Sequence, residues 1–109
     1  IYASMPQIIF SPRSHRDIAR FTAFLEEVAP EKVAEAVQTI ISRIGQLEKN
    51  PLLGTSVPCE TIPNLRKLVI PYKKNGYVAL YKYDMNKGIV VVETIRHMRE
   101  LEPEFLKRM

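Results

Sequence analysis

The chain has 109 residues, a length that suits one domain and leaves little room for a second. Its hydrophobic content of 46% is enough for a single core and too high for a disordered chain. No apolar run approaches the roughly 18 residues that a membrane span needs. The single cysteine, Cys59, excludes an intramolecular disulfide framework, and with only two histidines the sequence has no zinc-site pattern. We therefore expect a soluble cytoplasmic protein without a metal or cofactor.

The positive charge is concentrated in the second half of the chain. Residues 1–63 carry six Lys/Arg against seven Asp/Glu, and residues 64–109 carry ten against five, so the halves have net charges of −1 and +5. This asymmetry indicates a basic surface for an anionic partner, either nucleic acid or an acidic protein segment, although a solvated basic face fits the charge equally well. Because Met5-Pro6 is typical of a native start, we expect residues 1–4 to be an artificial extension and residues 5–109 to form the domain.

The first elements are a strand and a helix. Gln7–Ser11 is a short β-prone run that Pro12 ends. Ser14 is predicted as the N-cap of the helix, with Asp17 in the capping-box position. The apolar stripe of this helix is Ile18, Phe21, Leu25 and Val28.

Pro30 ends the first helix and can occupy the first turn of the next. The second helix ends at Asn50-Pro51 and has the strongest pattern in the chain, with one face formed by Val33, Val37, Ile40, Ile41, Ile44 and Leu47. The short link between the helices predicts an antiparallel hairpin. Both stripes are interpreted as core and not as a cofactor site.

Residues 52–63 are predicted as a loop, and three strands follow over residues 65–70, 77–83 and 89–95. The turn signals between the strands, Asn75-Gly76 and Asn86-Lys87-Gly88, are short enough to predict an antiparallel meander. Residues 99–109 form a charged tail, with a short helix predicted from Pro103 onward. The order β-α-α-β-β-β, with a helical hairpin that must bury its stripe on one sheet face, predicts a two-layer α+β fold.

Four segments carry a resemblance to a known family. They are IGQLEKNPLLG (44–54), NLRKL (64–68), GYVALY (76–81) and VVETIRHMRE (91–100). In this order and spacing they resemble the "I..L...P..G", "LR.L", "Y...Y" and "V.I..I.H.R" elements of the RelE/ParE toxin superfamily of type II toxin–antitoxin systems. The resemblance spans nearly all of residues 6–100.

The resemblance implies one of two activities. RelE-like members are ribosome-dependent, metal-free messenger-RNA endonucleases, whereas ParE-like members (plasmid stabilisation proteins) poison DNA gyrase and have no nuclease role. Both are neutralised by an antitoxin whose C-terminal segment wraps around the toxin. The partners implied for this chain are therefore a cognate antitoxin and either gyrase or the ribosome with messenger RNA, and operator DNA is contacted only through the antitoxin.

The chemistry of RNA cleavage separates the two branches. Metal-free cleavage needs cations to clamp the phosphate and groups that move protons to and from its oxygens. RelE-like nucleases typically have an Arg in a pattern like "R-L-V-Y", where this chain has Val78, and a Tyr shortly after the last strand, where the tail has none. The two absences favour a ParE-like gyrase inhibitor, for which residues 100–109 are an expected contact. The alternatives are a nuclease with a divergent site and a degenerate toxin that only binds antitoxin and regulates its operon.

The candidate site residues lie in the basic half. A nuclease site would use Arg66, Arg96, His97 and Arg99. The candidates for binding the antitoxin or the target are Arg66, Lys67, Lys73, Lys74, Tyr77, Tyr81, Arg96, His97 and Arg99. Strand alternation places Arg96 and His97 on opposite faces and Tyr77, Tyr81 and Tyr83 on one face. Each candidate also has a structural interpretation: His97 fixes the tail, Arg66 is a solvated or antitoxin-paired arginine, the tyrosines build the sheet, and Lys73 and Lys74 form a solvated turn.

Overall fold

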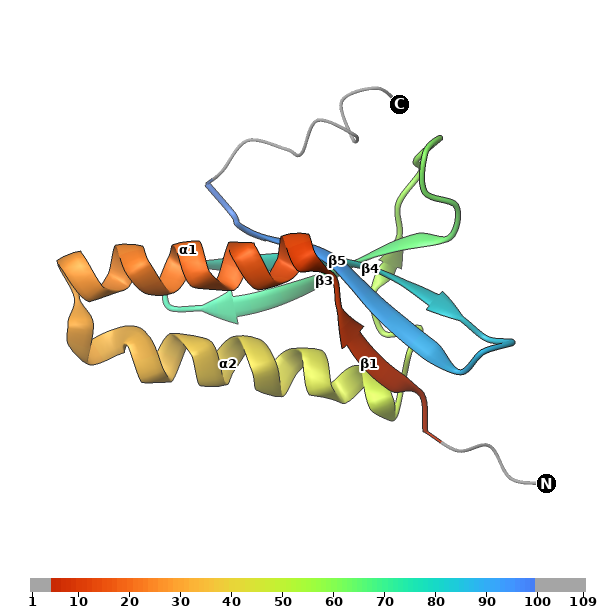
Figure 1. Ribbon diagram of the computed structural model, residues 1–109, viewed down its shortest axis with the longest axis horizontal. Coiled ribbons are helices and arrows are strands. Elements are labelled where there is room, and N and C mark those ends of the chain that lie inside the picture. The colour runs from red at the N-terminus through yellow and green to blue at the C-terminus, as the bar shows by residue number, and fades with distance from the viewer. Residues whose placement is uncertain (1–4, 100–109) are drawn as a thin grey trace.

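The structure, a computed structural model, describes residues 5–99. Two antiparallel helices lie side by side and cover one face of a sheet (Figure 1). The elements in chain order are β1 (Gln7–Phe10), α1 (Pro12–Val28), α2 (Val33–Gly45), β2 (Thr55–Ser56), β3 (Leu65–Tyr72), β4 (Asn75–Asp84) and β5 (Ile89–His97), with single 3-10 turns at Pro30–Lys32 and Gln46–Glu48. The predicted two-layer α+β fold with a helical hairpin is confirmed. The helix predicted from Pro103 lies outside the described residues.

The sheet is mixed, with the strand order β1-β5-β4-β3-β2. Strands β3, β4 and β5 form the predicted antiparallel meander. The first strand joins it in parallel, with Gln7 opposite Ile89 and Phe10 opposite Val92. A parallel pair needs a long crossover connection, and here nearly the whole chain supplies it. The segment predicted as a loop contributes the two-residue strand β2, which pairs with β3 through Thr55 and Ser56.

Helix α1 begins earlier than predicted. Its N-cap is Ser11, whose hydroxyl accepts a hydrogen bond from the Ser14 N–H at 3.0 Å, and Pro12 occupies the first helical turn. The prediction of Ser14 as N-cap and Asp17 as its capping-box partner is therefore wrong. The physical reason is that proline is favoured at the first helical position, where its missing N–H and fixed φ carry no penalty. Ser14 and Asp17 are instead buried within the helix.

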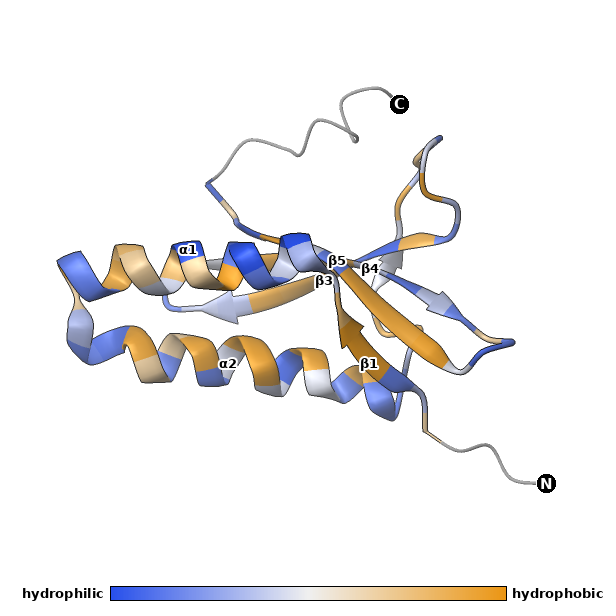
Figure 2. Cartoon of the chain, viewed as in Figure 1, coloured by the Kyte–Doolittle hydropathy of each residue, from blue (hydrophilic) through white to orange (hydrophobic). Residues whose placement is uncertain are grey.

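The core lies between the helical hairpin and the sheet. Its largest cluster brings the helical residues Phe21, Ile40, Ile44 and Leu47 against strand residues that include Leu68, Ile70, Val90, Val92 and Ile95. Strands β1 and β5 are strongly hydrophobic along most of their length (Figure 2). Two residues of the predicted stripes are exposed, Val28 by 59% and Ile41 by 42%. Val28 is at the last turn of α1, and in α2 the small Ala36 is buried in addition to the larger residues.

The turn of the β3–β4 hairpin includes fewer residues than predicted. Lys73 and Lys74 form the turn, and Asn75 and Gly76 already belong to β4, opposite Tyr72 and Pro71. The predicted place of Lys73 and Lys74 in the turn is therefore confirmed, whereas the prediction of Asn75-Gly76 as the turn dipeptide is wrong. Lys73 adopts the left-handed conformation that such a tight turn needs (φ 55°). Gly76 is needed for another reason, because at φ 142° a side chain there would collide with the carbonyl oxygen of Ile70.

The sheet face away from the helices, called the outer face below, is partly covered by the loop that follows β2. Val57, Cys59 and Ile62 pack there against Leu65 and Leu80. Among residues 5–99, no helix is both long and apolar enough to cross a bilayer.

Candidate functional site

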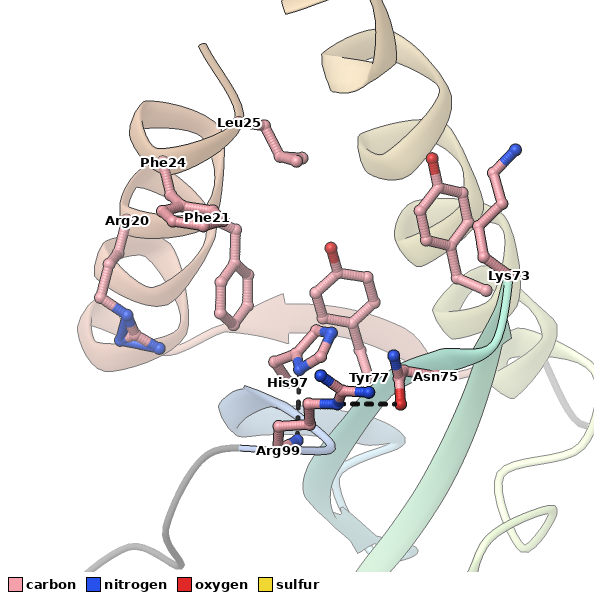
Figure 3. Close-up of a pocket in the computed structure, with 10 residues that line it drawn as sticks. Arg20, Phe21, Phe24, Leu25, Lys73, Asn75, Tyr77, His97 and Arg99 are labelled. Atoms are coloured by element: carbon pink, nitrogen blue, oxygen red, sulfur yellow. Dashed lines mark hydrogen bonds between the residues drawn. The ribbon is translucent and has the colours of Figure 1, made fainter. Parts of the chain in front are cut away.

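A groove of about 610 Å³ opens between α1, the tip of the β3–β4 hairpin and the end of β5 (Figure 3). Its walls are formed by Arg20, Phe21, Phe24, Leu25, Tyr72, Lys73, Asn75, Tyr77, His97 and Arg99. None of these residues is acidic, and four of them are basic. The groove therefore combines an apolar, aromatic interior with a basic rim.

Tyr77 is the centre of the aromatic floor. Its ring is buried and lies 5.0 Å from the Phe21 ring, 6.2 Å from the Tyr72 ring and 5.4 Å from the His97 ring (centroid distances). The contact with His97 is edge to face, at 86°. Such tilted arrangements place the positive ring edge on the negative face of its neighbour, so the floor is held by ring geometry as well as by burial.

His97 and Arg99 close the groove at the end of β5. The His97 Nδ1 accepts a hydrogen bond from the Arg99 N–H at 3.2 Å, and the Arg99 guanidinium Nε donates to Asn75 Oδ1 at 3.3 Å (Figure 3). The Met98 N–H donates to the carbonyl oxygen of Gly76 at 3.0 Å. These contacts hold the residues that follow β5 against the start of β4.

Two further basic side chains, Arg20 and Lys73, stand on the rim. Arg20 lies over the Phe21 ring, 4.8 Å from its centroid, and Lys73 lies 5.6 Å from the centroid of Tyr72. The Lys73 ammonium is also 3.3 Å from the Glu35 carboxylate of α2. The Tyr72 hydroxyl and then Lys73 hold the pKa of the Glu35 carboxyl below that of an ordinary glutamate. Partial burial, together with that carboxylate, raises the pKa of Tyr72 to about 12, so its phenol stays neutral.

His97 faces the groove because β5 contains a bulge. Tyr81 of β4 pairs with Val92 and Leu80 pairs with Thr94, so Glu93 is an extra residue without a partner on β4. In a regular strand the side chain of His97 would lie on the face opposite Val92. The bulge reverses the alternation and returns His97 to the helix side. Arg96 consequently lies on the outer face, so the predicted opposite orientation of these two residues is confirmed.

Arg66 and Tyr81 are on the helix side too, but they hold a loop. The Arg66 guanidinium donates to the carbonyl oxygen of Gly54 from Nη2 at 2.7 Å and from Nε at 3.1 Å, and to that of Leu52 at 3.2 Å. The buried Tyr81 hydroxyl accepts from the Gly54 N–H at 2.9 Å and donates to the Pro51 carbonyl at 2.8 Å. Both residues thus fix residues 51–54 and lie apart from the groove-lining set.

The remaining candidates are also outside the groove. Lys67 is exposed on the outer face, in register with Leu80, and Arg96 lies on the same face opposite Val78. Lys74 is exposed in the hairpin turn. Of the nine sequence-predicted binding residues, the structure gathers four in the groove: Lys73, Tyr77, His97 and Arg99.

Sequence reasoning missed the contribution of α1. Phe24 is 61% exposed at the groove, and Arg20 and Phe21 form its wall next to β5. The available signal was Phe24 itself, a large apolar residue that lies off the stripe formed by Phe21 and Leu25. Within residues 5–99, no group of three or more His, Cys, Asp or Glu is arranged to hold a metal ion.

The family model for the ParE toxin of type II toxin–antitoxin systems (parDE) matches residues 8–102 of this chain. The chain belongs to the ParE toxin family. It is also 30% identical, over 96 residues, to Toxin RelE3 of Caulobacter vibrioides, a match that covers 88% of this chain and 98% of the relative. It is therefore a toxin of a type II toxin–antitoxin system, as the resemblance predicted.

Solved structures share the ParE/RelE fold. A chain of the chromosomal ParDE toxin–antitoxin system from P. aeruginosa has a TM-score of 0.71 and 18% identity, covering 89% of this chain and all of that one. A chain of the toxin–antitoxin complex RelBE2 from Mycobacterium tuberculosis has a TM-score of 0.55 and 20% identity, covering 85% and 98%. A mutant of the E. coli toxin RelE in the free state has a TM-score of 0.55 and 17% identity, covering 96% and 98%.

Proposed function

We propose that this ParE-family toxin acts by binding DNA gyrase and inhibiting it, without chemistry of its own. The observation that carries the proposal is the dispersal of the four residues that the sequence predicted for a nuclease site. Arg66 is engaged by the carbonyls of residues 52 and 54, Arg96 is on the outer face, and only His97 and Arg99 share a surface. Val78, at the position of the expected clamping arginine, lies on the outer face beside Arg96. Cleavage of a phosphodiester needs its cations and proton carriers around one phosphate.

The groove is the surface we assign to the protein partner. Aromatic residues with a basic rim are typical of the centres of protein interfaces, where aromatic and arginine side chains carry most of the binding energy. Phe24 is largely exposed and contributes apolar area that a partner can cover. The expected contact by residues 100–109 lies outside the described residues and stays a prediction.

A cognate antitoxin is the second partner that we propose. The solved relatives from P. aeruginosa and M. tuberculosis are described as toxin–antitoxin systems or complexes. The basic half of this chain suits an acidic antitoxin segment. Operator DNA would then be contacted only through the antitoxin, as the resemblance implies, and the test is rescue of growth by the product of the adjacent gene.

The deciding experiment uses the purified toxin in two assays, inhibition of gyrase supercoiling and cleavage of messenger RNA on translating ribosomes. We expect inhibition in the first and no codon-specific cuts in the second. Cuts without inhibition would refute the proposal and support the alternative, a ribosome-dependent nuclease, which the 30% identity to Toxin RelE3 favours. His97→Ala should then lower the cleavage rate about a hundredfold or more. Normal growth on induction without antitoxin would point instead to a degenerate toxin.

The groove itself is tested with charge and size variants that leave the core intact. Lys73→Glu and Phe24→Ala should each weaken gyrase inhibition, by about tenfold for a side chain that contributes 1.4 kcal/mol to binding. The matched controls are Lys87→Glu and Met85→Ala, at exposed positions in the turn at the opposite end of β4. If the controls and the groove variants are equally active, the partner binds elsewhere.

A further inference from the structure

Asp17 is a buried charged residue that the proposed function does not yet use. Its exposed fraction is 4%, and among the described residues only Ser14 and Thr94 are other buried polar residues. An ionised carboxylate is costly to bury unless charged or hydrogen-bonding groups surround it. The groups that surround the Asp17 carboxylate therefore indicate its role.

Helix α1 takes the place of a neighbouring strand beside the bulge of β5. Strand β1 ends at Phe10, opposite Val92, so the bulge that follows has no strand on that side. Ser11 covers its first half. The Ser11 N–H donates to the carbonyl oxygen of Val92 at 3.0 Å, and the Ser11 hydroxyl donates to that of Glu93 at 2.7 Å.

Asp17 covers the second half of the bulge. Its Oδ2 accepts hydrogen bonds from the Thr94 hydroxyl at 2.6 Å and from the Ile95 N–H at 2.9 Å. Its Oδ1 is 3.3 Å from Arg20 Nη1. The main-chain groups of β5 on the side where β1 has ended, together with the Thr94 hydroxyl, thus find partners at Ser11 and Asp17, which satisfies them in a buried place.

The bulge decides on which face of the sheet the side chains at the end of β5 lie. Without the extra residue at Glu93, Ile95 and His97 would lie on the outer face, and Thr94 would lie in the apolar core between sheet and helices. With it, Ile95 packs in the core and His97 reaches the groove. Because side chains alternate between the two faces of a sheet, a register shift of one residue moves each side chain that follows fully to the other face.

We propose that Asp17 is a positioning residue: by accepting from Thr94 and Ile95 it fixes the bulge of β5 and so holds His97 and Arg99 in the groove. Asp17 itself does not line the groove. The statement that the groove binds gyrase rests on the proposed function. The statement that Asp17 positions His97 does not.

Substitution of Asp17 by asparagine tests the charge of the side chain without changing its shape. Asp17→Asn keeps the volume but replaces one carboxylate oxygen with an NH2 donor. Oδ1 and Oδ2 both face donors, so an amide nitrogen at either position opposes another donor. A second pair of variants tests the hydrogen bond between Thr94 and Asp17 from the side of β5. Thr94→Val keeps the volume and removes the hydroxyl, whereas Thr94→Ser keeps the hydroxyl and removes a methyl group.

The first readout is the contact between the His97 and Tyr77 rings, measured by NMR as their cross-relaxation and as the ring-current shift of the imidazole. In Asp17→Asn, at a temperature where the variant is folded, we expect this contact to be lost in a substantial fraction of molecules. Thr94→Val should weaken it and Thr94→Ser should preserve it, although Ser leaves a small cavity. The control Ile44→Val lowers stability in the α2 core and should leave the contact unchanged.

The second readout is gyrase inhibition. Loss of a hydrogen bond to a charged group corresponds to roughly tenfold or more in an equilibrium, so Asp17→Asn should weaken inhibition by about that factor. Its effect should add only in part to that of His97→Ala, because the two variants share the His97 side chain while Asp17 also holds Arg99 and pairs with Arg20 of the groove.

The proposal is overturned if Asp17→Asn, or Thr94→Val where Asp17→Asn does not fold, retains the His97–Tyr77 contact. A toxin that never inhibits gyrase would refute the proposed function while leaving the NMR result to decide the role of Asp17.

Discussion

Removal of one hydroxyl group tests how residues 51–54 are held. The Tyr81 side chain is fully buried, and its hydroxyl bridges the Gly54 N–H and the Pro51 carbonyl. Tyr81→Phe therefore leaves two main-chain groups without their partner, and the Gly54 N–H is buried. At about 1–3 kcal/mol for each buried group that loses its hydrogen bond, and with the half-buried Pro51 carbonyl able to recruit water, we expect a loss of about 2–3 kcal/mol in the free energy of unfolding.

The assay is urea denaturation followed by far-UV circular dichroism, in which the midpoint should fall with an unchanged m-value. By thermal unfolding, the same loss corresponds to a decrease of roughly 10–20 °C for a domain of this size. The matched control is Tyr83→Phe on the same strand, because the Tyr83 hydroxyl makes no hydrogen bond with the rest of residues 5–99. A loss below about 0.5 kcal/mol for Tyr81→Phe would refute the bridging role.

Three further outcomes follow from the same contacts. Gly54→Ala should cost about 3 kcal/mol, because its Cβ would come within 2.5 Å of a main-chain oxygen of β3, whereas Gly45→Ala meets no atom within 4 Å and should stabilise its helix by about 0.5–1 kcal/mol in the same denaturation assay. Arg66→Met should lower stability yet leave gyrase inhibition intact at a temperature where the variant is folded; lost inhibition there would make Arg66 a target contact. Carboxyl NMR should give Glu35 a pKa below that of an ordinary glutamate, because the Tyr72 hydroxyl and the neighbouring lysine favour the carboxylate. Since the folded-state pKa is the lower one, this contact stabilises the fold above the unfolded-state pKa and is lost as the pH falls through the folded-state value; an ordinary pKa would contradict it.

Most of the secondary structure and the two layers could be predicted from local patterns in the sequence. The α2 stripe of Ile40, Ile44 and Leu47 has the period of a helix with one buried face, and the strands follow from β-branched runs between turn residues. These signals are local, because each depends on the propensity and periodicity of a short window. The local error at Ser14 arose where two serines compete for the same N-cap and Pro12 decides between them.

Which candidate residues share a site depends on contacts between segments far apart in the chain. The parallel pairing of β1 with β5 joins segments about 80 residues apart, and the bulge at Glu93 is held by Ser11 and Asp17 across a similar distance. No window of sequence contains both partners of such contacts. The bulge sets the face of His97, and the same packing brings Phe24 of α1 to the groove while Arg66 is drawn to the loop at residues 51–54. The sequence therefore indicated which side chains were candidates for a site. Their assembly into one surface depended on long-range hydrogen bonds and on the bulge, which reverses the alternation of side chains along β5.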